Sequence, residues 1–227
     1  MSRERTVADR LREEYNDLLV EIWRVASHLE AEIRYLVLPV FNRLERHERL
    51  VVKTRVKDCE SAIKKLLGRF EGNLPEVEDE EKLSLLQLRD LVGVRVLVFP
   101  SERLQEVDRC LRDESASLRF AWSSLLHQWD PDTIAYAGEE QFAPKYHGFC
   151  AGASKKIMAE YQIVPMLIGQ FWDVEHSALY KPVGAAKGAD KDDKLKQLRA
   201  NVERALYSFE REFERYTRSS SMPPSKY

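Results

Sequence analysis

The chain has 227 residues, 33% charged and 44% hydrophobic, a length that suits one sizeable α/β domain with helical additions rather than two full domains. Its formal net charge of -2 excludes a general attraction to nucleic acids or membranes, so any polyanion site must be a local patch. The three scattered cysteines argue against a disulfide framework or zinc site, and no apolar run could span a bilayer, so we expect a cytoplasmic protein with no membrane partner.

A long amphipathic helix is expected from Val7 to near Pro39. Its apolar positions recur at steps of four and three: Leu11, Tyr15, Leu18, Ile22, Val25, Leu29, Ile33 and Leu36. We expect this face to pack on the rest of the domain. A helix-mediated homo-oligomer is the alternative, although no charge pattern typical of a coiled coil supports it.

A short helix is expected from about Cys59 to Leu67, with Asp58 as its N-cap and Gly68 as its stop. Basic and hydroxyl side chains gather around its start, where backbone N–H groups already favour anions. The pattern therefore indicates a polyphosphate cradle or, more simply, a solvated basic face. The residues concerned are Arg55, Lys57, Ser61 and Lys65.

The stretch from Leu88 to Phe99 is the most apolar and β-branched run of the chain and predicts a buried central strand. Asp90 at its entry and Arg95 within it need partners, because an unpaired buried charge costs several kcal/mol. A carboxylate for a hard cation and a guanidinium for a nucleotide would serve a metal-nucleotide site. An internal ion pair is the other interpretation.

After Pro100 we expect a helix capped by Ser101, with Leu104, Val107, Cys110 and Leu111 as its inner face. The aromatic and apolar stretch from Leu118 to Gln128 predicts a strand. Residues 129–145 contain several prolines, aspartates and a glycine, and predict a long loop of the kind that closes over a ligand.

Two short strands are expected next, over Tyr146 to Gly152 and Ile157 to Val164. Glu160 lies mid-strand among apolar neighbours, so it faces either water or a cation. If its strand lies beside the strand that follows Asp90, the two carboxylates can share Mg²⁺. Pro165 then opens a helix to about Tyr180, in which His176 alone is typical of a structural histidine.

A final helix should follow a Gly/Ala-rich linker, Pro182 to Asp190. Its expected inner stripe is Leu195, Leu198, Val202, Leu206, Phe209 and Phe213. We thus expect one domain over residues 1–216, with a helical part at 1–50, a catalytic core at 51–181 and a C-terminal helix at 191–216. Residues 217–227 are expected to form a disordered tail.

Four segments together resemble the synthetase domain of the RelA/SpoT family, which makes guanosine tetra- and pentaphosphate alarmones. Arg55-Val-Lys57 with Ser61 and Lys65 is similar to the family's RxKxxxSxxxK pattern, and Asp90-Leu-Val-Gly-Val-Arg95 to its D-L-x-G-x-R strand. Glu160-Tyr-Gln162 is similar to its ExQ motif, and residues 174–181, which contain Glu175-His176 and Tyr180-Lys181, to its EH…YK ending. Their order and spacing agree over about residues 36–181.

The resemblance implies an α+β fold with a mixed β-sheet of about five strands and flanking helices, related to nucleotidyltransferases. It implies transfer of pyrophosphate from ATP to a ribose 3′-hydroxyl, with Asp90 and Glu160 holding Mg²⁺. Arg55 and Arg95 would enclose the adenine, and Lys57, Ser61 and Lys65 would bind the ATP phosphates. The residues implied on the acceptor side are Tyr146, Cys150, Gln162 and His176. No hydrolase segment of the family is expected.

The sequence departs from the family mainly where the acceptor should bind. Lys145 stands for the glycine and Cys150 for the histidine of the family's G-Y-R-S-x-H, and Val164-Pro165 replaces its Arg-Thr. A guanine nucleotide is the leading acceptor. Alternatives are a toxin-like enzyme acting on the tRNA 3′ end or on adenine nucleotides, with an antitoxin partner, and an inactive nucleotide-binding module. A purely structural helical protein would leave the motif cluster unexplained.

Overall fold

The structure is a computed structural model that describes residues 6–68, 83–117, 125–179 and 189–221. It contains one five-stranded sheet whose order is β1-β2-β5-β4-β3. Strands β2 and β5 are parallel, and the other neighbouring pairs are antiparallel, so the sheet is mixed as expected. The strands are β1 (Arg49–Val56), β2 (Val92–Phe99), β3 (Asp130–Tyr136), β4 (Gln141–Phe149) and β5 (Met158–Pro165).

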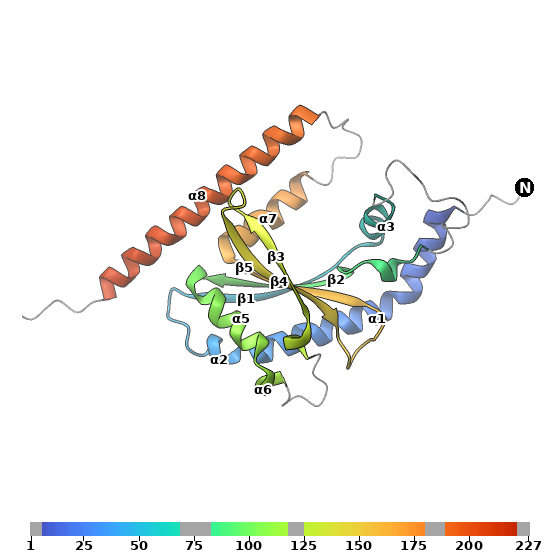
Figure 1. Cartoon of the computed structure of the whole chain (residues 1–227), viewed down its shortest axis with the longest axis horizontal. Helices are drawn as coiled ribbons and strands as arrows, with labels where there is room; N and C mark the ends of the chain where they lie inside the picture. Colours follow the sequence, from blue (N-terminus) through green and yellow to red (C-terminus); the bar gives the residue numbers. More distant parts are fainter. Residues whose placement is uncertain (1–5, 69–82, 118–124, 180–188, 222–227) are drawn as a thin grey trace, which may run out of the picture.

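The larger core lies where the N-terminal helix crosses one face of the sheet (Figure 1). Helix α1 (Val7–Leu36) begins at a capping box in which Thr6 and Asp9 satisfy each other's backbone N–H groups. Its predicted apolar positions Leu11, Ile22 and Leu29 are fully buried, which confirms the expected packing face. The same side of the sheet carries α2 (Leu38–Phe41), α5 (Leu104–Arg112) and α6 (Glu114–Ser117).

The opposite side of the sheet carries α7 (Met166–Leu179) and α8 (Ala189–Ser221), which cover only part of that face (Figure 1). A second, smaller core forms there around Leu97, Val164, Ile168 and Trp172. Helix α3 (Cys59–Gly68) packs near the start of α1 and begins as predicted, with Asp58 Oδ1 accepting from the Ser61 N–H. Short 3₁₀ turns η1 (Leu85–Gln87), η2 (Ser101–Arg103) and η3 (Leu126–Gln128) join the larger elements.

Two local predictions between Pro100 and Lys145 are wrong, and a third is contradicted where the structure describes it. Ser101 does not cap α5, because η2 intervenes and the backbone N–H of Ser101 donates to Glu210 on α8. The predicted strand over Leu118 to Gln128 ends as η3, and its residues 118–124 lie outside the described residues. The predicted loop over residues 129–145 is instead the β3–β4 hairpin, whose turn places Ala137, Gly138 and Glu139 at positive φ.

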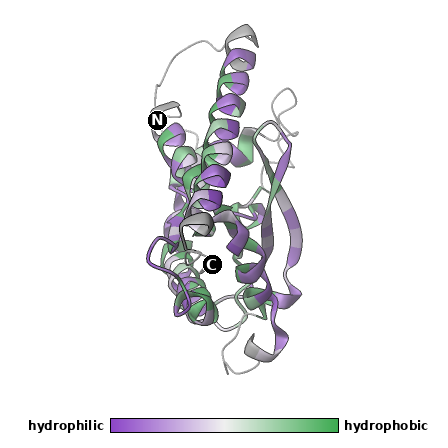
Figure 2. Ribbon diagram, turned by 90° about the vertical axis from the view of Figure 1, so that its left-hand side faces the viewer, coloured by the Kyte–Doolittle hydropathy of each residue, from purple (hydrophilic) through white to green (hydrophobic). Residues whose placement is uncertain are grey.

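Helix α8 uses only part of the predicted apolar stripe as its inner face: Leu206 packs against the smaller core and Phe213 contacts Phe99. Its buried side chains are Glu203, Glu210 and Glu214, while Leu198 and Phe209 are 59% and 58% exposed. Figure 2 shows hydrophilic and hydrophobic residues alternating along the helix. The helix also runs to Ser221, past the predicted end at residue 216.

Most of the predicted linker and the last six residues of the predicted tail lie outside the described residues. Within the part of the chain that is described, every helix is too short or too polar to pass through a bilayer.

Candidate active site

A row of polar side chains crosses four strands on the sheet face that α7 and α8 leave partly open. Across β1, β2, β5 and β4, Lys53 pairs with Arg95, Arg95 with Gln162, and Gln162 with Lys145. A second row lies two positions away in each strand. In it, Arg55 pairs with Gly93, Gly93 with Glu160, and Glu160 with His147. Residues paired across strands share a face, and so do residues two apart in one strand. The pairing therefore brings all of these side chains together.

Glu160 lies at the middle of this row and is poorly solvated. Its side chain is 16% exposed; Oε1 accepts from Gln162 Nε2 at 2.8 Å, and Oε2 lies 3.8 Å from His147 Nδ1. Burial raises the pKa of Glu160, and the negative charge of Asp90 adds to that rise. Gly93, its neighbour on β2, leaves open the space beside the carboxylate.

Asp90 lies just before β2, between two lysines. Its Oδ2 is 2.6 Å from Lys65 Nζ and 3.2 Å from Lys57 Nζ. Burial opposes its ionisation, but the two ammonium groups hold the pKa of Asp90 below its ordinary value. Oδ1 is also buried, and no hydrogen-bond donor for it lies among the described residues. A charged carboxylate oxygen in this state is suited to a further cation.

Arg95 and Arg55 lie on the same face but contact different partners from α7. Arg95 donates to Gln162 Oε1 at 3.1 Å and to Asp173 Oδ1 at 2.7 Å, and its guanidinium lies 5.6 Å from the Trp172 ring centroid. Internal ion pairing, the other interpretation of these two charges, is present: Arg95 pairs with Asp173, and Asp90 pairs with the two lysines described above.

Arg55 Nη2 is 3.0 Å from His176 Nε2. Burial and the nearby positive charges, Arg55 first among them, lower the pKa of His176, which keeps the imidazole neutral at pH 7. A neutral imidazole beside a guanidinium accepts its hydrogen bond. His176 thus orients Arg55 toward the open face.

The predicted phosphate cradle is only partly assembled. Lys57 and Lys65 converge on Asp90, as described above. Ser61 lies in the first turn of α3, where its backbone N–H is already taken by the capping carboxylate of Asp58. Asp58 thereby competes with an anionic ligand for this part of the helix N-terminus.

Tyr146 and Cys150 do not join the other predicted site residues. Tyr146 pairs with Tyr161 on the opposite face of the sheet, stacks on its ring at 4.8 Å and donates to Asp108 at 2.7 Å. Cys150 is fully buried in the larger core, and burial raises the pKa of its thiol. Gln162 and His176, by contrast, both lie on the open face.

Five charged or titratable residues on this face were not among the predicted site residues: Lys53, Asp132, Lys145, His147 and Asp173. Lys145 donates a hydrogen bond to Asp132 at 2.7 Å, which lowers the pKa of Asp132 to about 2. His147 is 8% exposed, with Nε2 3.6 Å from Asp132 Oδ2. His147 lies within the strand predicted from Tyr146 to Gly152. Lys145, two residues earlier on the same face, would have been indicated with it had residues 129–145 been recognised as strands.

Asp90 and Glu160 fit a magnesium site by their chemistry. Mg²⁺ takes one or two protein carboxylates and keeps its other positions for water and substrate phosphates. The buried Oδ1 of Asp90, which has no hydrogen-bond donor in the described part of the chain, and the poorly solvated carboxylate of Glu160 both need positive charge. Among the described residues, no group of three or more His, Cys, Asp or Glu side chains is placed to hold a metal without substrate.

Comparison with known proteins identifies the fold. The sequence matches no family model and no curated protein. The structure is similar to small alarmone synthetase 1 from Bacillus subtilis bound to its product pppGpp, with a TM-score of 0.60 and 16% identity over 92% of this chain and 100% of that one. For the same protein bound to AMPCPP the TM-score is 0.53, with 16% identity over 91% and 99%.

A GTP pyrophosphokinase family protein from Streptococcus pneumoniae is similar to the same degree, with a TM-score of 0.57 and 19% identity over 91% of this chain and 96% of that one. The fold is thus that of the small alarmone synthetases, as the sequence resemblance implied.

Proposed function

We propose that this chain is an ATP- and Mg²⁺-dependent pyrophosphokinase that transfers the β,γ-pyrophosphate of ATP to the 3′-hydroxyl of a guanine nucleotide, GDP or GTP. The observation that carries the proposal is the open sheet face, where two half-buried carboxylates, Asp90 and Glu160, lie among basic side chains. Structures of the same fold bind AMPCPP, an ATP analogue, and the product pppGpp, which supports both substrates.

The donor nucleotide is assigned to the β1–β2 side of the face. Lys57 and Lys65 provide ammonium groups for the triphosphate, and Arg55 and Arg95 provide planar guanidinium groups for phosphate or the adenine ring. The contacts of Arg55 with His176 and of Arg95 with Asp173 hold both side chains in place before the nucleotide arrives. Such positioning carries much of the catalysis of phosphoryl-type transfer.

The acceptor is assigned to the β4–β5 side, with Glu160, Gln162, Lys145 and His147 facing it. The raised pKa of Glu160 makes its carboxylate a better proton acceptor than an ordinary glutamate. The acceptor 3′-oxygen attacks the β-phosphorus of ATP, its proton passes to Glu160, and the bond between the β-phosphorus and the oxygen bridging to the α-phosphate breaks. AMP leaves with the electron pair of that bond.

Bound Mg²⁺ would neutralise charge on the β- and γ-phosphates, with Asp90 and Glu160 as its protein ligands. Lys57 and Lys65, which contact Asp90, would act on the same phosphate charge.

The test incubates the protein with γ-labelled ATP, Mg²⁺ and one acceptor at a time, and then determines which molecule carries the label. The acceptors are GDP, GTP, AMP, ATP and bulk tRNA. A parallel reaction with α-labelled ATP measures AMP. We expect label on the guanine nucleotides, one AMP per product, and loss of transfer in Asp90→Asn and Glu160→Gln. Glu212→Gln, an exposed site on α8, is the matched control and should leave transfer unchanged.

The other outcomes identify the alternatives. ADP in place of AMP would mean transfer of a single phosphate and would contradict the proposal. Label on tRNA or adenine nucleotides alone would replace the guanine acceptor with the toxin-like one. ATP binding without any transfer would establish the inactive nucleotide-binding module.

A further inference from the structure

A pocket lies away from the candidate active site, at the point where α8 passes the loop before β1 and the end of β2. Its volume is about 350 Å³. Five glutamates line it, together with the rings of Phe99 and Phe213. Those glutamates are Glu45, Glu48, Glu102, Glu106 and Glu214.

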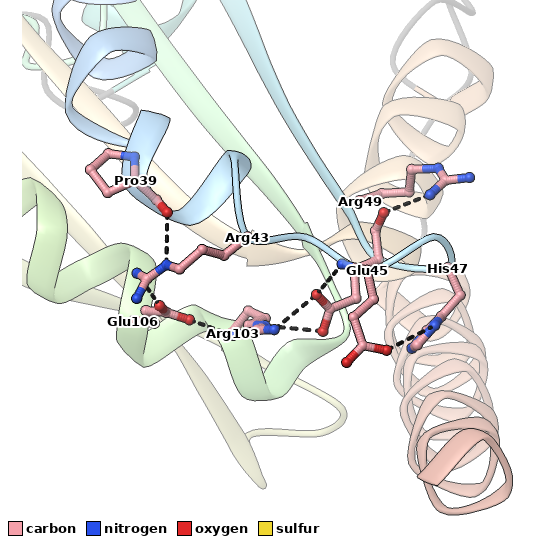
Figure 3. Close-up of polar contacts among 8 residues, drawn as sticks. Pro39, Arg43, Glu45, His47, Arg49, Arg103 and Glu106 are labelled. Carbon is pink, nitrogen blue, oxygen red and sulfur yellow. Dashed lines mark hydrogen bonds and ion pairs between the residues drawn. The ribbon is translucent and has the colours of Figure 1, made fainter. Parts of the chain in front are cut away.

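Part of this negative charge is compensated, as Figure 3 shows. Arg103 donates two hydrogen bonds to Glu48, at 3.0 and 2.9 Å, and a third to Glu106 at 2.8 Å. Arg43 donates to Glu106 as well, at 2.5 Å. Burial opposes ionisation of Glu48, but Arg103 holds its pKa below the ordinary value. All three guanidinium nitrogens of Arg103 are therefore occupied.

Glu214 is not paired with either of these arginines. It lines the pocket, its residue is 8% exposed, and its Oε1 is buried without a hydrogen-bond donor among the described residues. One turn earlier, Glu210 is also buried, and its Oε2 has no hydrogen-bond donor in the same ranges. Burial raises the pKa of both groups. A donor or cation entering the pocket would supply what Glu214 lacks.

The apolar wall of the pocket favours an organic ammonium ion over a bare metal ion. The rings of Phe99 and Phe213 lie 5.7 Å apart and tilted, and His47 contacts Phe213 edge-on at 6.5 Å. Aromatic rings attract organic ammonium groups and pack against methylene chains. A bare divalent ion would instead require several oxygen ligands, and the described residues contain no cluster of three acidic, His or Cys side chains placed to hold a metal.

We propose that this pocket binds a free aliphatic polyamine, with one ammonium group on Glu214 and the methylene chain against Phe99 and Phe213. The pocket volume falls within the range of small-molecule sites. Glu45 and Glu102 lie at the same pocket and attract the remaining ammonium groups. The ligand would join α8 to the β2 end of the sheet.

The test is calorimetric titration of the full chain with spermidine at fixed ionic strength and without nucleotide, so that it does not depend on transfer activity. We expect saturable binding. Glu214→Gln should weaken it about tenfold to a hundredfold, the usual value of a hydrogen bond to a charged group. Glu212→Gln, two residues earlier on the exposed side of α8, carries the same charge change and should leave binding unchanged.

A second variant keeps the proposal testable if Glu214→Gln does not fold. Phe213→Leu keeps an apolar side chain and removes the ring, and we expect about a twofold to fivefold loss of affinity. Circular dichroism checks that each variant folds. Equal binding by the wild type and Glu214→Gln would overturn the proposal. So would displacement of spermidine by an equal concentration of Mg²⁺, or binding of an oligolysine peptide when spermidine does not bind.

Discussion

Substitution of Glu210 by Gln should stabilise the protein in alkaline but not in acidic solution. Glu210 is fully buried against the loop after Pro100, where one carboxylate oxygen accepts the Ser101 N–H and the other has no donor among the described residues. Burial raises the pKa of Glu210 to about 7, and the nearby charge of Glu214 contributes to the rise. A glutamine keeps the acceptor for Ser101 and removes the charge.

The magnitude follows from the pKa in the two states. A rise from 4.5 in the unfolded chain to about 7 in the folded protein, at 1.36 kcal/mol per unit, amounts to about 3 kcal/mol. Below pH 4.5 the Glu210 carboxyl is protonated in both states and does not lower the free energy of unfolding. As the pH rises from 4.5 to 7, the unfolded state loses its proton first, so stability falls; above pH 7 the loss is complete. Glu210→Gln avoids this loss.

Urea unfolding of the wild type and Glu210→Gln at pH 5 and pH 8 measures the effect. We expect the variant to be more stable by up to about 3 kcal/mol at pH 8 and by about 1 kcal/mol or less at pH 5. Glu212→Gln, on an exposed part of the same helix, should show no such difference. If Glu210→Gln were destabilised equally at both pH values, the side chain would be ionised and well paired, and the reasoning would be refuted.

Three further substitutions test the sheet and the open face. Gly148→Ala would place its Cβ 2.4 Å from ring carbons of buried Trp129, so we expect a loss of about 1–3 kcal/mol in urea unfolding; an unchanged midpoint would contradict the packing. Gly93→Ala meets Glu160 Cγ at an ordinary 3.6 Å, so unfolding should be unaffected while pyrophosphate transfer falls; unchanged transfer would place substrate elsewhere. His147→Phe removes a group that lowers the pKa of Glu160, so the acidic limb of the pH–rate profile should move to higher pH, and an unmoved limb would separate His147 from the reaction.

The elements predicted from the sequence are those whose periodicity is strong and uninterrupted. Helix α1, strands β2 and β5 and the start of α3 follow from their apolar patterns and cap residues. The β3–β4 hairpin was predicted as a loop because Pro131 and Pro144 are turn signals. Both prolines are tolerated, since β3 is an edge strand and the pairing of β4 with β5 begins only at Lys145.

The same hairpin explains why part of the acceptor side was not predicted. Because side chains in a strand alternate between faces, a position one residue away from a site residue lies in the opposite core. The resemblance indicated Tyr146 as an acceptor-side residue. In the observed register Tyr146 pairs with Tyr161 on the core face, whereas Lys145 and His147 lie on the open face. Sequence motifs identify a segment of chain, whereas only the pairing decides which of its two faces is functional.

Asp90 and Glu160 illustrate how two carboxylates of one site acquire different tasks. The two lysines hold the pKa of Asp90 down, so it stays charged and suits a permanent cation ligand. Burial, with Asp90 as a negative neighbour, raises the pKa of Glu160 and so favours proton uptake by its carboxylate. Pairs whose environments separate their pKa values in this way commonly divide charge stabilisation from proton transfer. We therefore expect Lys65→Met, which removes one ammonium group from Asp90, to weaken ATP binding more than it changes the pH dependence of transfer. Nucleotide titration together with a pH–rate profile of that variant would separate the two effects, and a shifted profile with unchanged ATP affinity would reverse the assignment.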